Sequence, residues 1–250
     1  MNFSFQLYSA RNFIPWTDVY HSLSSLGFTD VEGFGAVYED ASATRELLDA
    51  HNLAMPSGHF SLDDLENNLE ATLKTASTLG CSRLFCPYLD ESQRPSDSAG
   101  WQQFGQRLND IGARVKDAGR HFGWHNHDFE FHKCDDGCVP MRSILESAPD
   151  IDWEMDVAWV ARAETDPVPW ITEFGSRISA VHVKDIATPG ECEDEDGWAD
   201  VGFGVLDWQS LLNQITKETS ARLLVAEHDN PSDHERFARQ SIESMKKFAT

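Results

Sequence analysis

The feature that most limits the fold is a regular alternation along the chain. A short apolar or β-branched run is followed by an amphipathic stretch, and this pair recurs eight times. Runs of the first kind predict strands, and apolar residues at helical spacing predict helices. The expected strands are Phe3–Tyr8, Phe28–Gly33, Leu53–His59, Arg83–Tyr88, Phe122–His127, Ile151–Val157, Ile178–Lys184 and Leu223–His228. The expected helices are Pro15–Leu26, Ala43–His51, Leu62–Leu79, Trp101–Ala118, Met141–Ser147, Val168–Phe174, Trp208–Thr219 and Asp233–Phe248.

Eight strand–helix pairs in 250 residues predict an α/β fold, a single-domain (β/α)8 TIM barrel over residues 1–250. A doubly wound sheet of roughly six or seven strands is the alternative. In a barrel, the chemistry lies at the C-terminal ends of the strands. These ends are therefore where candidate functional residues are sought.

Charge and cysteine content restrict the classes of partner. With 42 acidic and 20 basic residues, the formal net charge is −22. A chain so acidic repels the phosphate backbone of nucleic acids and an anionic membrane surface. The five cysteines are odd in number, and no apolar run approaches the roughly 18 residues of a membrane span. The expected location is a reducing cytoplasm.

Polar side chains stand where the last three predicted strands end. In "IDWEMDVAW", alternation places Asp156 nearest the C-terminal end, on the face that it shares with Glu154. His182 and Lys184 follow apolar residues on one face of "RISAVHVKD". Glu227 has the same place in "RLLVAEHD". All of these ends meet at one mouth of the predicted barrel.

The fifth predicted strand adds imidazoles to the same mouth. In "GWHNHDFEF", His125 and His127 share a face and Glu130 lies just beyond, on the loop. Taken singly, each polar residue has a plain structural explanation, such as a cap or an ion pair. Their recurrence at equivalent strand ends favours a divalent cation, because carboxylates packed together cost several kcal/mol unless they are neutralised. Carboxylates with one imidazole suit Mn²⁺ best, with Mg²⁺ or Co²⁺ as alternatives.

Two other clusters of polar residues are weaker candidates for a functional site. Cys134 and Cys138 with His132 lack an evident fourth zinc ligand, so ordinary thiols are expected. Glu191–Asp196 is interpreted as a solvated acidic loop. No phosphate-binding glycine loop or nucleophile elbow is present.

The chain resembles the sugar phosphate isomerase/epimerase family of xylose isomerase-like TIM barrels, which includes inosose dehydratase and tagatose 3-epimerase relatives. The likeness covers nearly the whole sequence, and "WHNHDFEF" with "RISAVHVKD" is its most specific part. The segments that carry it are "FQLYSARNF" (5–13), "VEGFG" (31–35), "SGHFSLDDLE" (57–66), "FCPYL" (85–89), "LNDIGARVKDAG" (108–119), "WHNHDFEF" (124–131), "MDVAWVARAETDP" (155–167), "RISAVHVKD" (177–185), "VGFGVLDW" (201–208) and "LLVAEHD" (223–229).

The resemblance implies a cation held by Asp156, His182 and Glu227. Many relatives end the fifth strand with Glu, where this chain has His125. Glu130 is therefore the favoured remaining ligand, folding back to the mouth, and His125 is the alternative.

The family's usual chemistry is proton abstraction beside a carbonyl, with the metal stabilising an enediolate. Glu130, Glu227 and Lys184 are the expected catalytic residues. The expected substrate-binding residues are Arg11, His59, Trp124, His125 and His127. Trp159, Trp198 and Phe203 are further candidates for stacking on a sugar.

The expected substrate is a non-phosphorylated sugar, ketosugar or cyclitol, because the loops after the last two strands are dominated by acids. Isomerisation or epimerisation is the favoured reaction. Dehydration, or elimination from a 3-keto-glycoside, is the alternative that uses the same metal site. A repair nuclease and a non-catalytic sugar-binding barrel are weaker alternatives. The expected partner is a small sugar, with no nucleic acid and no membrane, and homo-oligomerisation is left open.

Overall fold

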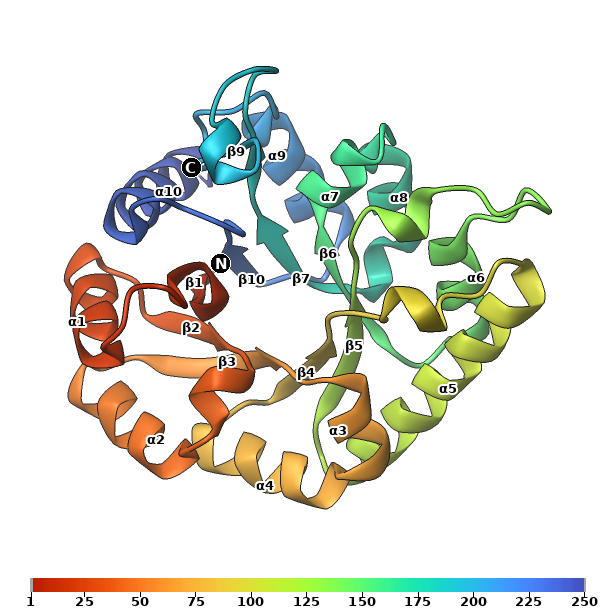
Figure 1. Ribbon diagram of the computed structural model, residues 1–250, viewed down its shortest axis with the longest axis horizontal. Helices are drawn as coiled ribbons and strands as arrows, with labels where there is room; N and C mark the ends of the chain where they lie inside the picture. The colour runs from red at the N-terminus through yellow and green to blue at the C-terminus, as the bar shows by residue number, and fades with distance from the viewer. Residues whose placement is uncertain (1, 250) are drawn as a thin grey trace.

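The computed structural model describes residues 2–249, and they form a closed parallel barrel of eight strands surrounded by helices (Figure 1). The strands follow one another around the barrel in the order β1, β10, β7, β6, β5, β4, β3, β2. They are β1 (Asn2–Gln6), β2 (Asp30–Gly33), β3 (Ala54–His59), β4 (Arg83–Cys86), β5 (His121–His125), β6 (Asp152–Asp156), β7 (Ile178–Val183) and β10 (Leu223–Ala226). The predicted single-domain TIM barrel is confirmed.

The helices mostly follow the predicted pattern. They are α1 (Trp16–Leu26), α2 (Ala41–Ala50), α3 (Leu62–Asn67), α4 (Leu69–Leu79), α5 (Ser98–Asp117), α6 (Pro140–Ser147), α7 (Val157–Arg162), α8 (Pro167–Phe174), α9 (Trp208–Glu218) and α10 (His234–Phe248). The predicted helix Leu62–Leu79 is two helices, because the backbone of Asn68 leaves the helical region at φ −129°. Among the described residues, no helix combines the length and apolar character needed to cross a bilayer.

Alternation along the strands separates two apolar layers. Outward residues such as Leu84, Trp124 and Val181 join the large core between barrel and helices. Inward residues form a smaller cluster that fills the barrel below the mouth, composed of Phe85, Ala180, Leu223 and Val225. The inward face is therefore apolar at mid-height, and the polar residues of the same strands come afterwards, toward the C-terminal ends.

A short antiparallel ribbon, absent from the sequence prediction, follows β7. It pairs β8 (Asp185–Ile186) with β9 (Trp198–Ala199). The buried carboxylate of Asp185 accepts hydrogen bonds from the backbone amides of Ile186, Gly202, Gly204 and Leu206 at 2.9–3.2 Å. Strands of two residues are too short to give a period-two pattern, and the carboxylate at Asp185 is what fixes this loop.

Gly123, on β5, gives a test of interior packing. A Cβ atom there would lie 2.7 Å from the carbonyl oxygen of Asp152 and 2.8 Å from the ring of Phe85. We expect Gly123→Ala to lower the free energy of unfolding by about 1–3 kcal/mol, as overpacking does. Gly35→Ala is the matched control, because no atom lies within 4 Å of its Cβ position. Urea unfolding measures both, and equal stabilities would contradict this account of the barrel interior.

Candidate metal centre

Four side chains converge at the mouth of the barrel. Asp156 ends β6 and pairs in register with His182 of β7, while His125 ends β5 and Glu227 follows β10. One ligand atom from each lies within 4.8 Å of the others. All four residues are buried, with exposed fractions of 5% or less. The structure thus brings together Asp156, His182 and Glu227, as the sequence predicted.

The position of Asp156 is fixed by hydrogen bonds that leave one of its oxygens unused. Asp156 Oδ1 accepts from the backbone amide of Trp159 at 2.9 Å, which caps α7. The side chain of Asn126 binds the backbone of Asp156. Asn126 Oδ1 accepts a hydrogen bond from the Asp156 backbone amide at 3.0 Å, and Asn126 Nδ2 donates one to the Asp156 carbonyl oxygen at 3.1 Å. Asp156 Oδ2 and His125 Nδ1 are buried and have no hydrogen-bond partner among the described residues. Buried polar atoms are normally paired, so these two atoms fit the ligands of a cation.

Lys184 lies behind this group rather than in front of it. Its Nζ is 2.7 Å from Asp229 Oδ2 and 3.3 Å from Glu227 Oε2. The ammonium also lies over the rings of Trp159 and Trp198, 5.0 and 4.3 Å from their centroids. Burial lowers the pKa of Lys184, but the neighbouring carboxylates outweigh burial and leave the pKa above its ordinary value. Lys184 therefore stays charged and holds Glu227 and Asp229 in place.

The protonation of these side chains follows from their burial and from the charges of their neighbours. Burial lowers the pKa of His182, but Glu154, Glu227 and Glu32 outweigh burial and raise the pKa well above its ordinary value. Burial, reinforced by His182, lowers the pKa of His125 to about 3. Burial raises the pKa of Asp156 to about 7. His125 is therefore neutral at pH 7, as a metal ligand must be.

Glu130, the expected fourth ligand, lies elsewhere. Its buried carboxylate accepts hydrogen bonds from Trp124 Nε1 and from the backbone amide of His127, both at 2.9 Å. Glu130 belongs to none of the side-chain groups placed to hold a metal ion, and His125 has the place expected for it. The indole of Trp124 points to Glu130 and not into the mouth, and Trp124 is fully buried. These two side chains bind each other.

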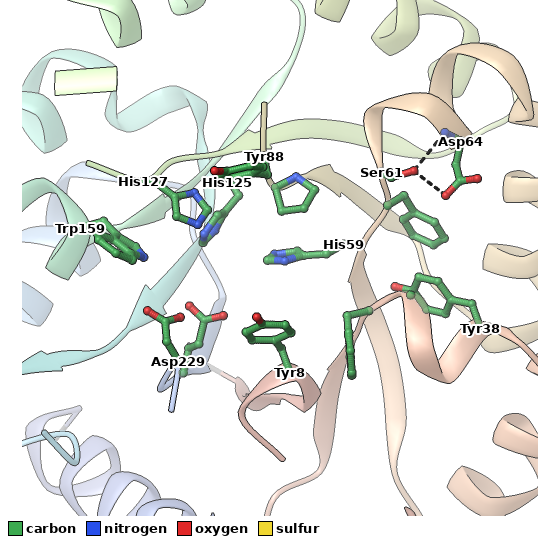
Figure 2. A pocket seen from close by; sticks show the side chains of 15 residues that line it. Tyr8, Tyr38, His59, Ser61, Asp64, Tyr88, His125, His127, Trp159 and Asp229 are labelled. Atoms are coloured by element: carbon green, nitrogen blue, oxygen red, sulfur yellow. Dashed lines mark hydrogen bonds between the residues drawn. The ribbon is translucent and has the colours of Figure 1, made fainter. Parts of the chain in front are cut away.

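A pocket of about 510 Å³ opens above the four side chains. Figure 2 shows Trp159, His127, His125 and Asp229 at one end and Tyr38, Ser61 and Asp64 at the other. The lining residues are Tyr8, Phe34, Gly35, Tyr38, His59, Phe60, Ser61, Asp64, Pro87, Tyr88, His125, His127, Trp159, Glu227 and Asp229.

Of the expected substrate-binding residues, His59, His125 and His127 line this pocket. Arg11 is not among the lining residues; it stacks over the ring of Tyr8 at 3.9 Å and donates to the carbonyl oxygen of Asp229. Of the candidates for stacking, Trp159 lines the pocket, whereas Trp198 is buried over Lys184. Phe203 is 63% exposed and is not among the lining residues.

Two acidic residues that the sequence analysis did not assign to the site lie one layer deeper. Glu32, on β2, accepts hydrogen bonds from Gln6 and Ser57 and lies 2.7 Å from His182 Nε2. Glu154 is 2.7 Å from His59 Nε2. Alternation had placed Glu154 on the face of Asp156, and Glu32 lies in "VEGFG" at the end of β2. The available signal was an acidic residue on the inward face of a strand.

The burial of Glu130 predicts a pH-dependent stability. Burial raises the pKa of Glu130 from its ordinary value of 4.5 to about 8, so the folded state binds this proton more tightly than the unfolded chain does. The stabilisation from Glu130 is complete below pH 4.5 and is lost as the pH rises toward 8. We expect the stability of Glu130→Gln relative to wild type to rise by on the order of 1 kcal/mol per pH unit within this window. Urea unfolding of metal-free protein at pH 5, 6 and 7 measures this; a constant difference would contradict it.

The similarity to known proteins extends over nearly the whole barrel. The sequence model of the xylose isomerase-like TIM barrel family matches residues 21–248. A sugar phosphate isomerase/epimerase from Parabacteroides distasonis superposes with a TM-score of 0.81 at 17% identity, covering 100% of this chain and 99% of that one. No curated protein matches the sequence.

Two further solved structures share this fold. One is the probable 3-DHS dehydratase AsbF from Bacillus anthracis, with a TM-score of 0.77, 14% identity and coverage of 98% of this chain and 99% of that one. The other is the IOLI protein with a bound zinc atom, with a TM-score of 0.78, 12% identity and coverage of 100% and 98%. At such identities the likeness concerns the fold. Together with the match of the family model, it shows that this chain belongs to the xylose isomerase-like TIM barrel family.

Proposed function

We propose that the protein is a metal-dependent isomerase or epimerase that moves a proton beside the carbonyl of a non-phosphorylated sugar, ketosugar or cyclitol. The observation that carries this proposal is the convergence of Asp156, His182, Glu227 and His125 beneath the pocket, with two buried ligand atoms left without partners. His125 takes the role first expected of Glu130. Relatives named as isomerase/epimerase, and one with a bound zinc atom, support the same class.

These residues would hold the metal and move the proton. A bound divalent ion, with Mn²⁺ the first choice, would supply positive charge for the oxygens of an enediolate. Glu227 lines the pocket, and its carboxylate is the group proposed to accept the proton from carbon. Lys184 positions Glu227 and Asp229 through its ion pairs and does not line the pocket. The aromatic rings at the pocket wall exclude water and offer stacking surfaces for a sugar.

Elimination is the second candidate, and the position of Glu130 favours it. With Glu130 bound to Trp124, the imidazole of His59 is the candidate acid that accompanies Glu227 at the pocket. Burial lowers the pKa of His59, but Glu32 and Glu154 outweigh burial and leave the pKa above its ordinary value. A carboxylate base with an imidazole acid is an unequal pair, which suits removal of a proton from one atom and protonation of a departing hydroxyl at another. The neighbour named as a probable dehydratase supports this alternative.

A first test removes the proposed ligands. Glu227→Gln and His182→Ala should each lower turnover by at least about 10²-fold, because the base or a cation ligand is lost. Solvent deuterium incorporation in D₂O, with analysis of products from a panel of free ketoses, aldoses and oxidised cyclitols, measures turnover and separates epimerisation from elimination.

Glu243→Gln, on the exposed face of α10, is the control and should retain wild-type turnover. Circular dichroism shows whether the variants fold. Near-normal exchange by folded Glu227→Gln would overturn the assignment of the base.

A second test concerns substrate charge. Among the described residues that line the pocket there is no lysine or arginine, whereas Asp64, Glu227 and Asp229 are acidic. A phosphate group would meet repulsion there without a charge partner. We expect kcat/KM for a free ketose to exceed that for its phosphate ester by at least about tenfold, a difference of about 1.4 kcal/mol. A preference for the ester would contradict the proposed substrate class.

A further inference from the structure

A small cavity lies in the barrel at the end opposite the pocket. Its volume is about 80 Å³, and its lining residues are Asn2, Pro56, Arg83, Ser179, Arg222 and Leu223. Asn2 and Arg83 begin their strands, Ser179 is the second residue of β7, and Arg222 directly precedes β10. The cavity therefore lies at the N-terminal ends of the strands, whereas the candidate metal centre lies at their C-terminal ends.

The cavity is inside the barrel and not between the barrel and its helices. In the order of strands around the barrel, β10 stands opposite β4 and β7 stands opposite β3, and all four contribute to the lining or flank it (Figure 1). Arg83 points inward, because Phe85, two residues later on β4, belongs to the inner apolar cluster. Leu223 belongs to both that cluster and the cavity lining. The inner cluster thus separates the cavity from the polar mouth.

Two arginines meet at this cavity without acidic partners. Arg83 is half-buried, and Arg222 is exposed at the rim. The described arginines that form ion pairs are Arg45, Arg107, Arg142 and Arg236. Arg222 Nη1 donates to the carbonyl oxygen of Ala221 at 2.7 Å, a contact that neutralises no charge. Acidic residues outnumber basic ones by 42 to 20, so two unpaired guanidinium groups at one cavity depart from the general charge balance.

Buried polar atoms at the cavity also lack partners. Arg83 Nε and Ser179 Oγ are both buried, and neither has a hydrogen-bond partner in the part of the chain that the structure describes. Buried polar groups are normally paired, and a buried N–H without an acceptor costs free energy. These donors therefore need an acceptor that the surrounding side chains do not supply.

The neighbouring acidic residue, Asp30, is already engaged. Asp30 is tied to the lining through a hydrogen bond with Asn2, and Thr29 Oγ1 donates to its carboxylate at 3.3 Å. Neither contact involves an arginine, so Asp30 does not neutralise the two guanidinium groups. Water could fill the cavity and accept hydrogen bonds, but it would leave the positive charges unbalanced.

We propose that this cavity is a binding site for a small tetrahedral oxyanion, held by Arg83, Arg222 and Ser179. The planar fork of a guanidinium group matches two oxygens of such an anion, and a hydroxyl adds a further donor. The anion would connect β4 with β7 and β10 across the barrel. Because the unfolded chain does not form this site, binding should stabilise the fold. The site is independent of the reaction at the opposite end.

The competing explanation is that both arginines are merely hydrated. The net charge of −22 repels anions in general, although salt screens distant charges beyond about 8 Å at physiological ionic strength. Under this explanation, an oxyanion stabilises the protein only as it does any protein, by exclusion from the surface. Removing Arg83 would then leave the effect of the anion unchanged.

The experiment measures Tm of the full-length protein in sodium sulfate and in sodium chloride at equal ionic strength. We expect sulfate to raise the Tm of wild type by at least about 2 °C more than that of Arg83→Gln. Arg83→Lys keeps the charge but loses the fork, and Ser179→Ala loses only a hydroxyl; both should reduce the rise. Arg239→Gln is the matched control, because Arg239 is exposed on α10, and it should keep the full rise. Equal rises in wild type and Arg83→Gln would overturn the proposal.

Crystals soaked in sodium selenate locate the anion, because selenium scatters anomalously and selenate has the shape of sulfate. Selenium density between Arg83 and Arg222 in wild type, absent from Arg83→Gln, supports the site. An empty cavity in wild type, or selenium at the mouth of the barrel alone, would overturn it. Density in the cavity without an effect of Arg83 on Tm would mean binding at crystal concentration only, and would also count against the proposal.

Discussion

The mouth of this barrel is governed by the burial of several carboxylates around a single buried lysine. Glu32, Glu154, Asp156 and Glu227 are almost wholly removed from water, and Lys184 lies among them under two indole rings. Charges of one sign tolerate such burial only with partners, so the imidazoles, Lys184 and the proposed cation are parts of one electrostatic arrangement. The barrel strands set the positions of these carboxylates. Because the carboxylates need positive partners, the site is suited to bind a cation.

Much of the fold was accessible from the sequence because the signal recurs. Each barrel strand is buried on both faces, so short apolar runs between amphipathic helices mark it clearly. The same regularity explains why Asp156, His182 and Glu227 could be assigned: each stands at or just beyond the end of a strand whose earlier residues are apolar. The two-residue strands β8 and β9 are too short to leave a periodic pattern, and the short helix α7 begins directly after β6; none of the three was expected.

The contacts of single side chains were harder to infer. Glu130 follows β5 closely enough to reach the mouth, yet its carboxylate bonds the indole of Trp124 on the outer side of the same strand. Position in sequence does not show which of two faces a loop side chain will take. Glu32 and His182 are 150 residues apart and become neighbours only because the barrel closes. Their contact depends on strand register and on closure, neither of which a local pattern encodes.

The ribbon after β7 determines from which side a substrate can approach. Trp198 of β9 covers Lys184, and Asp185 holds the following loop by backbone amides. Opening this segment would expose a buried cation and strip a carboxylate of its donors, so it acts as a fixed wall and not as a lid. The pocket lining includes no residue of the ribbon and extends across the loops that follow β1 to β4, from Tyr8 to Tyr88. A substrate of the proposed class would therefore come in over that rim, where the aromatic residues of the pocket lining would contact it.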